Sequence, residues 1–415
     1  MPEVSVVVEL RVTVEERPDP LGLELAIAAE GRRAARELFT AALVVIDEAA
    51  TAASGGARQR TEPRWVATTV GRVRACRHRV RTADRSFHPL DEALGLGQAE
   101  ASPALREMVC DLATRMPYRQ VAEVASRLTG EHLSHQSAWR VLRGEGARIR
   151  DDEARLVEAI FALGEAPPEP VRPPTLVVAE ADGTYLRAQR ESGRSFEVKT
   201  GVAYTGKRRA GGRRHPRWAL VGKLCHATTA DADGFGMAFA TRAIHALGLH
   251  RVPHLLVAHD GLDEFGSTFR DYFPGAVHQV DHFHLDERLW EAAGANERRF
   301  RWLKARAFAD PARLARGIRQ GRVVVHGRRA EDLPGYLEAV AKDLWGILRM
   351  PAELRRGRMR IVGTGVVEKH QDLLVKRRMR GRGMRWTRRG ADDLLALICL
   401  RASDDWPTRW GVIAA

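Results

Sequence analysis

Two short stretches decide the fold: residues 175–183, TLVVAEADG, and residues 254–261, HLLVAHDG. Each opens with a run of apolar residues, which predicts a buried strand. Each run then leads into an Asp-Gly pair, at Asp182 in the first stretch and at Asp260 in the second. Strands that finish in a carboxylate place oxygen ligands at one edge of a sheet, and magnesium and manganese ions prefer such ligands. The two stretches therefore predict a sheet with a divalent-metal site at its edge.

The flanking segments alternate between strand-like and helical patterns. Further elements are expected as strands over 196–204, 217–226 and 276–280 and as a helix over 233–247. The strand over 276–280 ends at Asp281, and residues 286–356 are expected to be helical apart from an apolar patch at 323–325. Strands interleaved with helices predict an α/β fold.

The N-terminal hundred residues predict a small α+β region whose role the sequence does not reveal. The expected elements are a strand over 4–14, a helix over 21–53, a basic β-like stretch over 65–80 and a turn over 86–97.

Residues 101–165 change to a pattern of short helices. Ser102 is a suitable N-cap before Pro103, and an amphipathic helix over 118–128 stops at Gly130. Ser134 then caps a further helix. A helix, a short turn and a second helix are what a helix-turn-helix DNA-binding unit requires. The alternative is a pair of packed helices with no DNA-binding role.

A proline-rich linker, APPEPVRPP at 166–174, separates the helical region from the α/β part. The predicted organisation is an N-terminal region (1–100), a helix-turn-helix region (101–165), the linker (166–174), and a catalytic core (175–285 and 361–415) interrupted by a helical insertion (286–360).

The composition favours an anionic partner. The 415 residues include 67 Lys or Arg against 53 Asp or Glu, a net charge of +14, and only seven of the basic residues are Lys. Arginine suits phosphate because its planar fork binds two oxygens at once, although a GC-rich genome also raises arginine content.

Other classes are excluded by composition. A hydrophobic content of 44% argues against a disordered chain, and four dispersed cysteines without a CxxC pair argue against a disulfide framework or a cysteine-rich zinc site. Apolar runs fall far short of the roughly 20 residues that cross a bilayer, and no signal peptide is evident. We expect no membrane association and a cytoplasmic, nucleoid-associated location.

A third carboxylate, Glu368, lies on a predicted helix in GTGVVEKHQDLL. The order Asp182, a long gap, Asp260, a longer gap and Glu368 resembles bacterial insertion-sequence transposases of the DDE class. Blocks at 86–96, 102–130 and above all 366–402 resemble the corresponding blocks of the ISLre-type transposases and their relatives.

The resemblance implies an RNase H-like catalytic core in which Asp182, Asp260 and Glu368 hold two Mg²⁺ or Mn²⁺ ions. The segment from Asp281 to His284 is similar to an Asp/Cys-x-x-His signature of related transposases. These two residues would orient the scissile phosphate or support a metal ligand. The alternative is a structural strand-to-helix junction with His284 in the core.

Several carboxylates are rivals for the metal-binding roles. Glu180 shares a strand face with Asp182 by period-2 alternation, as a supporting group or as the true ligand. Asp263 and Glu264 follow Asp260 beyond the strand end, and Asp372 shares a helix face with Glu368.

A strongly basic segment follows Glu368. Residues 355–389 hold thirteen Lys or Arg against two acids, so the segment is predicted to lie along a DNA backbone. The expected DNA-binding residues are Lys376, Arg377, Arg378, Arg380, Arg382, Arg385 and Trp386, the last stacking on an unpaired base. The alternative is a solvated basic face with Trp386 in the core.

The function implied by the resemblance is transposition. Metal-dependent cleavage at the element end would free a 3′-hydroxyl that attacks target DNA, with terminal inverted repeats and target DNA as partners and a homo-oligomer to pair the two ends. The alternatives are an RNase H-like DNA nuclease or resolvase, and a non-catalytic DNA-binding regulator derived from a transposase.

Overall fold

The computed structural model describes residues 5–14, 19–97, 100–190, 193–210, 218–261, 263–356 and 365–411. The chain divides into two compact units, Met1–Glu145 and Gly146–Ala415. Within the described part of the chain, no helix combines the length and the apolar character that a membrane span requires. The finer division into six segments stays a prediction.

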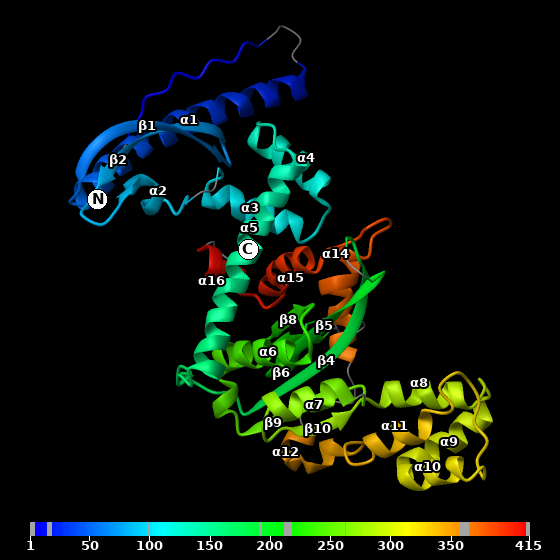
Figure 1. Ribbon diagram of the computed structural model, residues 1–415. Coiled ribbons are helices and arrows are strands. Elements are labelled where there is room, and N and C mark those ends of the chain that lie inside the picture. The colour runs from blue at the N-terminus through cyan, green and yellow to red at the C-terminus, as the bar shows by residue number, and fades with distance from the viewer. Residues whose placement is uncertain are drawn as a thin grey trace. The chain divides into compact units, whose positions relative to one another are not determined.

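The first unit contains an antiparallel sheet covered by one long helix. Its elements are α1 (Pro20–Ala53), β1 (Ala57–Thr68), β2 (Gly71–Arg81), β3 (Ser86–Phe87) and α2 (Pro89–Ala93) (Figure 1). The apolar face of α1 contributes Leu43 to a core with Val66, Val73 and Leu90. This arrangement confirms the expected helix and the expected β-like stretch.

Two details of the first unit differ from expectation. The strand expected over 4–14 is wrong for its described part, because residues 5–14 have no regular secondary structure and no described strand pairs with them. An alternating apolar pattern forms a strand only where a neighbour completes its backbone hydrogen bonds. The stretch expected over 65–80 is part of a hairpin, which turns at Gly71 with φ +110°.

The helical elements expected before the linker are present. They are α3 (Pro103–Ala113), α4 (Tyr118–Thr129) and α5 (His135–Val157). Ser102 caps α3 by accepting the Leu105 N–H at 3.3 Å, and Ser134 caps α5 by accepting the Ser137 N–H at 3.1 Å. Helix α4 ends at Gly130, whose φ is +73°. The helix–turn–helix arrangement is confirmed as secondary structure, and its role in DNA binding stays a prediction.

The second unit is built on a five-stranded mixed sheet in the order β10–β9–β4–β5–β8 (Figure 1). The strands are β4 (Leu176–Arg187), β5 (Ser195–Tyr204), β8 (Leu224–Thr228), β9 (His254–His259) and β10 (Val277–Val280). The central strand β4 pairs in parallel with β9 and antiparallel with β5. The α/β fold class is therefore confirmed.

The strand expected over 217–226 forms two strands. They are β7 (Trp218–Val221), which pairs with β6 (Gly206–Arg209) in a separate ribbon, and β8 in the main sheet. Gly222, at φ +54°, lies between the two strands.

Alternation along β4 separates the two faces of the sheet. Val177, Ala179 and Ala181 belong to an apolar core with residues of α6 (Ala232–Leu247) and α7 (Asp263–Tyr272). The intervening residues, including Glu180 and Asp182, face the other side, because side chains on a strand alternate between faces. On that side lie α13 (Gly365–Gln371), which packs against β4 and β5, and α15 (Arg388–Ala402), which packs against β8.

The helical insertion has a core of its own. Its elements are α8 (His282–Ala292), α9 (Glu297–Ala309), α10 (Pro311–Arg319), α11 (Leu333–Val340), a 3₁₀ turn (Gly346–Arg349) and α12 (Ala352–Arg356). Leu289, Leu303, Leu314 and Leu337 meet in its interior. The chain then continues through α13, a π-helical turn (Asp372–Lys376), α14 (Arg377–Met379), α15 and α16 (Trp406–Trp410).

Phe239 offers a test of the core of the second unit. Its side chain is fully buried on α6, and its ring packs against Phe235 and Phe273 and over Gly201. We predict that Phe239→Ala lowers the free energy of unfolding by about 3–5 kcal/mol, because a dense core does not refill the cavity. Tyr185→Ala, at a largely exposed residue of β4, serves as the control and should change it by about 0.5 kcal/mol or less. Urea denaturation measures both, and equal losses would contradict this packing.

Candidate functional site

The register of three parallel strands brings three aspartates to one edge of the sheet. Glu180 of β4 is opposite Ala258 of β9, and Val280 of β10 is opposite His259. One or two residues further along each strand, the same register makes neighbours of Asp182, Asp260 and Asp281. Adjacent strands are about 4.8 Å apart, so these three residues lie side by side.

One prediction about this edge is wrong: β4 does not end at Asp182. The strand continues to Arg187 because β5 pairs with it antiparallel from Val178 to Arg187. Asp182 lies instead where the pairing with β9 stops. Asp260 follows the end of β9 as predicted, and Asp281 follows the end of β10.

Glu180 connects the sheet to the helix that carries Glu368. Its carboxylate is fully buried and accepts the Val366 and Val367 N–H groups at 3.2 and 3.0 Å and the Tyr204 hydroxyl at 2.8 Å. Burial raises the pKa of Glu180 to about 7, against the lowering effect of these hydrogen bonds. With three donors on its oxygens, Glu180 positions the first turn of α13 and hence Glu368.

His284 lies between two of the predicted site residues. Its Nε2 atom is 3.8 Å from Asp281 Oδ2 and 3.8 Å from Glu368 Oε1. Ligand atoms of these three residues lie within 4.8 Å of one another, close enough to hold a metal ion together. The His284 Nε2 atom is buried and makes no hydrogen bond. Asp281 also caps α8, since its Oδ1 accepts the Phe283 N–H at 3.0 Å, so the junction is structural as well.

The electrostatics of Asp182 join it to the same group. The pKa of Asp182 is raised to about 6, chiefly because burial disfavours the charged form. The Gly183 N–H and His284 lower this pKa, while the neighbouring carboxylates of Asp260 and Glu368 raise it. The three predicted ligands therefore share one partly buried, negatively charged region.

This donor set fits a divalent cation. Carboxylate oxygens are ligands for Mg²⁺ and Mn²⁺, and a cation would offset the mutual repulsion of the carboxylates. The orphaned His284 Nε2 adds an imidazole donor, which Mg²⁺ uses less readily than transition-metal ions do.

The turn after β9 is held by the insertion. The Tyr336 hydroxyl of α11 donates to the Asp260 carbonyl oxygen at 2.8 Å. Gly261 has φ +84°, and a Cβ atom there would lie 2.5 Å from Val340 Cγ1, so only glycine fits. No motif in the sequence indicated Tyr336, because its contact crosses from the insertion to the sheet.

A second group, His259, His278 and Asp343, also brings three possible ligand atoms within 4.8 Å. All three residues are buried, and burial lowers the pKa of each histidine to about 4. The Asp343 oxygens accept from Arg349 and Arg270 at 3.1 and 3.2 Å, and His259 Nδ1 accepts the Gly261 N–H at 3.2 Å. Two guanidinium groups already neutralise the charge of the one carboxylate. This group is therefore better suited to stabilising the fold through buried hydrogen bonds than to binding a cation.

The rival carboxylates have other partners. Glu264 forms an ion pair with Lys199 at 3.0 Å, and Asp372 forms one with Arg377 at 2.7 Å. The side chain of Asp263 lies outside what the structure describes.

The basic segment after Glu368 is only partly available to DNA. Arg377, Arg380, Arg382 and Arg385 are exposed and Lys376 is half-buried. Two predicted DNA contacts do not agree with the structure, because Trp386 and Arg378 are buried. The Trp386 indole N–H donates to the Met379 carbonyl at 2.9 Å, and the Arg378 guanidinium lies 5.5 Å from its ring centroid. Trp386 therefore packs in the interior, in agreement with the alternative hypothesis that it belongs to the core, and its ring is not available for stacking on a base.

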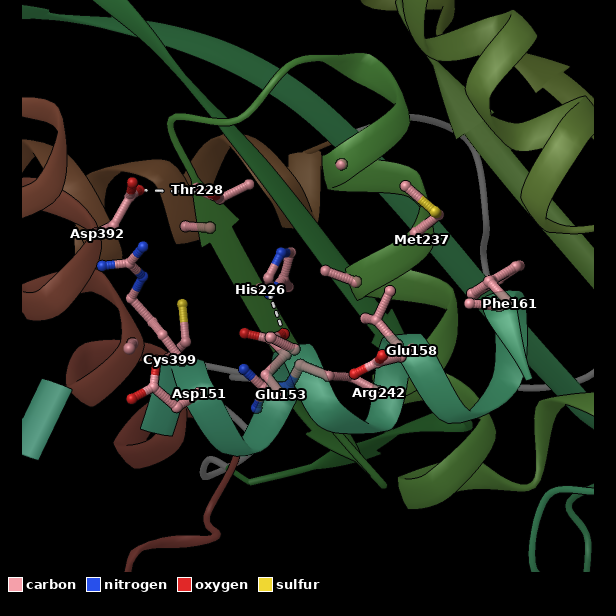
Figure 2. Close-up of a pocket in the computed structure, with 18 residues that line it drawn as sticks. Asp151, Glu153, Glu158, Phe161, His226, Thr228, Met237, Arg242, Asp392 and Cys399 are labelled. Atoms are coloured by element: carbon pink, nitrogen blue, oxygen red, sulfur yellow. Dashed lines mark hydrogen bonds and ion pairs between the residues drawn. The ribbon is translucent and has the colours of Figure 1, made fainter. Parts of the chain in front are cut away.

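A separate cavity of about 510 Å³ lies among α5, β8, α6 and α15 (Figure 2). His226 and Glu153 approach each other there, with 3.2 Å between Nδ1 and Oε1, and burial lowers the pKa of His226 to about 3. None of Asp182, Asp260 and Glu368 is among its described lining residues. The cavity is therefore distinct from the carboxylate site.

The chain is similar to part of a streptococcal protein. No protein-family profile matches the chain. The chain is similar to a Streptococcus gallolyticus protein described as "UPF0236 protein in vanSb 3'region", at 36% identity over 156 residues. That alignment covers 37% of this chain and 32% of the relative, so the chain spans about a third of the relative's length.

Metal binding at the carboxylate site can be measured without any assay of activity. We predict that Mn²⁺ raises the melting temperature of the protein and that Glu368→Gln weakens the Mn²⁺ affinity by roughly ten-fold or more. Asp372→Asn is the matched control, since Asp372 follows α13 directly and pairs with Arg377. Thermal melts over a Mn²⁺ titration give both affinities, and an equal effect of the two substitutions would contradict the assignment.

Proposed function

We propose that this protein is a DDE-type transposase of a bacterial insertion sequence, with an RNase H-like catalytic core. The observation that carries the proposal is the strand register that makes Asp182, Asp260 and Asp281 neighbours, with Glu368 brought to the same region by α13. The order of the three ligands along the chain is the order that the family resemblance implies.

The sheet supports the fold part of the proposal. Its central strand β4 pairs with antiparallel β5 on one side and with parallel β9 on the other. Because β8 is antiparallel to β5 and β10 is parallel to β9, β5 alone runs opposite to the other four strands of this sheet. This mixed arrangement, with helices on both faces, is what an RNase H-like core requires. The helical insertion lies between the second Asp and the Glu, as the resemblance implies.

In the proposed reaction the chain's own residues hold and orient the reacting groups. Asp182, Asp260 and Glu368 would bind two Mg²⁺ or Mn²⁺ ions, and His284 with Asp281 would fix the position of Glu368. When bound, such ions activate an attacking water or hydroxyl and stabilise the leaving oxygen in phosphoryl transfer. Glu180 keeps α13 in place through its two hydrogen bonds to that helix, and the Tyr204 hydroxyl of β5 fixes the Glu180 carboxylate, so the ligands would stay aligned during strand cleavage and strand transfer.

DNA is the proposed partner. The exposed arginines after Glu368 would contact phosphates, and the helix–turn–helix formed by α4 and α5 would read the terminal repeat. Two element ends must be joined, so we propose a homo-oligomer acting in the cytoplasm on the nucleoid. The remaining candidates share the site: a nuclease or resolvase would cut without joining, and a regulator would bind without cutting.

Strand cleavage tests the proposal directly. We predict that the purified protein nicks DNA that carries the repeats flanking its gene in the presence of Mg²⁺ or Mn²⁺, and that EDTA abolishes the reaction. Asp182→Asn, Asp260→Asn and Glu368→Gln should each lower the cleavage rate by roughly 100-fold or more, about 2.7 kcal/mol of barrier. Binding to the same DNA should remain close to that of the parent, because the phosphate contacts lie elsewhere.

Asp271→Asn is the control for these variants, since Asp271 is exposed at the end of α7. Joining of the cut end to a second DNA separates a transposase from a nuclease. Tight binding to the repeats with no metal-dependent cleavage would instead favour the regulator.

A further inference from the structure

A groove in the helical insertion is rich in arginine. It encloses about 830 Å³ along the end of α9, the length of α10 and the loop that follows. Four arginines line it: Arg306, Arg313, Arg316 and Arg322. All four are exposed, and Asp310 is the one acidic residue among the described lining residues.

The charge of the groove is not balanced within the protein. Residues 297–322 hold nine Lys or Arg against two acids. Within the part of the chain that the structure describes, no carboxylate forms a salt bridge with Arg306, Arg313 or Arg322. Arg316 is close enough to Glu338 for its charge to lower the pKa of that carboxylate. Asp310 is engaged as the N-cap of α10, where its Oδ1 accepts the Arg313 N–H at 2.8 Å.

The groove is held open by a defined local structure. Leu314 and Ala315 anchor α10 in the insertion core, so the opposite face of the helix, with Arg313 and Arg316, points outward. The loop folds back onto α10 because the Gly317 carbonyl accepts the Arg322 and Val323 N–H groups at 2.9 and 3.1 Å. The Arg306 guanidinium stacks on the exposed Trp302 ring at 3.9 Å from its centroid, which holds it at the rim.

We propose that this arginine groove binds the phosphate backbone of duplex DNA, as a contact surface separate from the basic segment after Glu368. This inference rests on the proposed function for the choice of DNA as the polyanion. Exposed arginines spread over two helices and a loop match a chain of phosphates, since each guanidinium can bind two oxygens of one phosphate. Contacts to phosphate carry no base sequence, so the groove would position DNA without selecting it.

The test measures DNA binding at several salt concentrations. The full-length protein is titrated, without divalent metal, into a fluorescent duplex of random sequence. Arg313→Ala/Arg322→Ala should make the slope of log K against log[salt] shallower by about 1.8, since each phosphate contact contributes about 0.9. At 0.1 M salt the affinity should fall by roughly ten- to a hundred-fold.

The matched control is Arg301→Ala/Arg319→Ala. These two exposed arginines lie on α9 and α10, the helices that border the groove, but Glu297 and Glu338 pair with them. The control removes the same total charge and should change the slope little. Equal losses in the two double variants, no loss in the groove variant, or a preference of the groove for single-stranded RNA would overturn the inference.

The outcome is separable from that of the proposed function. A parent protein that cuts DNA, while the groove variant keeps the parental salt slope, overturns the groove and leaves the transposase. A groove-dependent salt slope without any metal-dependent cleavage supports the groove and contradicts the transposase.

Discussion

The candidate site depends on the parallel hydrogen-bond register of β4, β9 and β10. The pairs Glu180–Ala258 and Val280–His259 determine that the aspartates which come next along these strands are neighbours on adjacent strands. A shift of one residue would turn every side chain of a strand to the other face. Asp182 would then leave the side of α13 and enter the apolar core under α6. The relative positions of the strand aspartates are therefore set by the register of the sheet. That register is fixed because the apolar side chains of the strands must face the core.

A buried carboxylate completes this arrangement. Glu180 stands on the same face as Asp182, and it satisfies two backbone N–H groups at the start of α13. A buried acceptor with three donors favours one position of the helix over any other, because leaving these donors unpaired would cost about 1–3 kcal/mol each. Tyr336 of the insertion holds the turn after β9 in a similar way, because its hydroxyl donates to the Asp260 carbonyl oxygen. The site is thus held by contacts from three segments far apart in the chain.

The sequence was informative where the signal was local. The apolar runs before Asp182 and Asp260, the caps at Ser102 and Ser134 and the proline-rich linker all depend on neighbouring residues, and the expected elements are present. The shared face of Glu180 and Asp182 also followed from strand alternation. The approach of His284 to Glu368 could not be derived from the chain alone, because it depends on how α8 and α13 pack.

The sequence predictions that were wrong concern features that depend on contacts with other parts of the fold. Residues 5–14 have a strand pattern, but a strand needs a partner that no pattern can guarantee. The apolar run before Asp182 predicts a strand that finishes there, yet pairing with β5 carries the strand to Arg187. Trp386 and Arg378 lie in a basic run that is predicted to contact DNA, but both are buried and the indole N–H donates to the Met379 carbonyl inside the fold. Each error concerns a hydrogen-bond partner that the local pattern does not reveal: no described strand pairs with residues 5–14, β5 pairs with β4 beyond Asp182, and Met379 accepts the Trp386 N–H.

The central claim is that carboxylates from β4, β9 and α13 form one divalent-cation site. Anomalous scattering from crystals of the protein grown with Mn²⁺ tests it most directly. We expect a strong peak within coordination distance of Asp182 and of at least one of Asp260 and Glu368. A peak at His259, His278 and Asp343 with none beside Asp182 would contradict it.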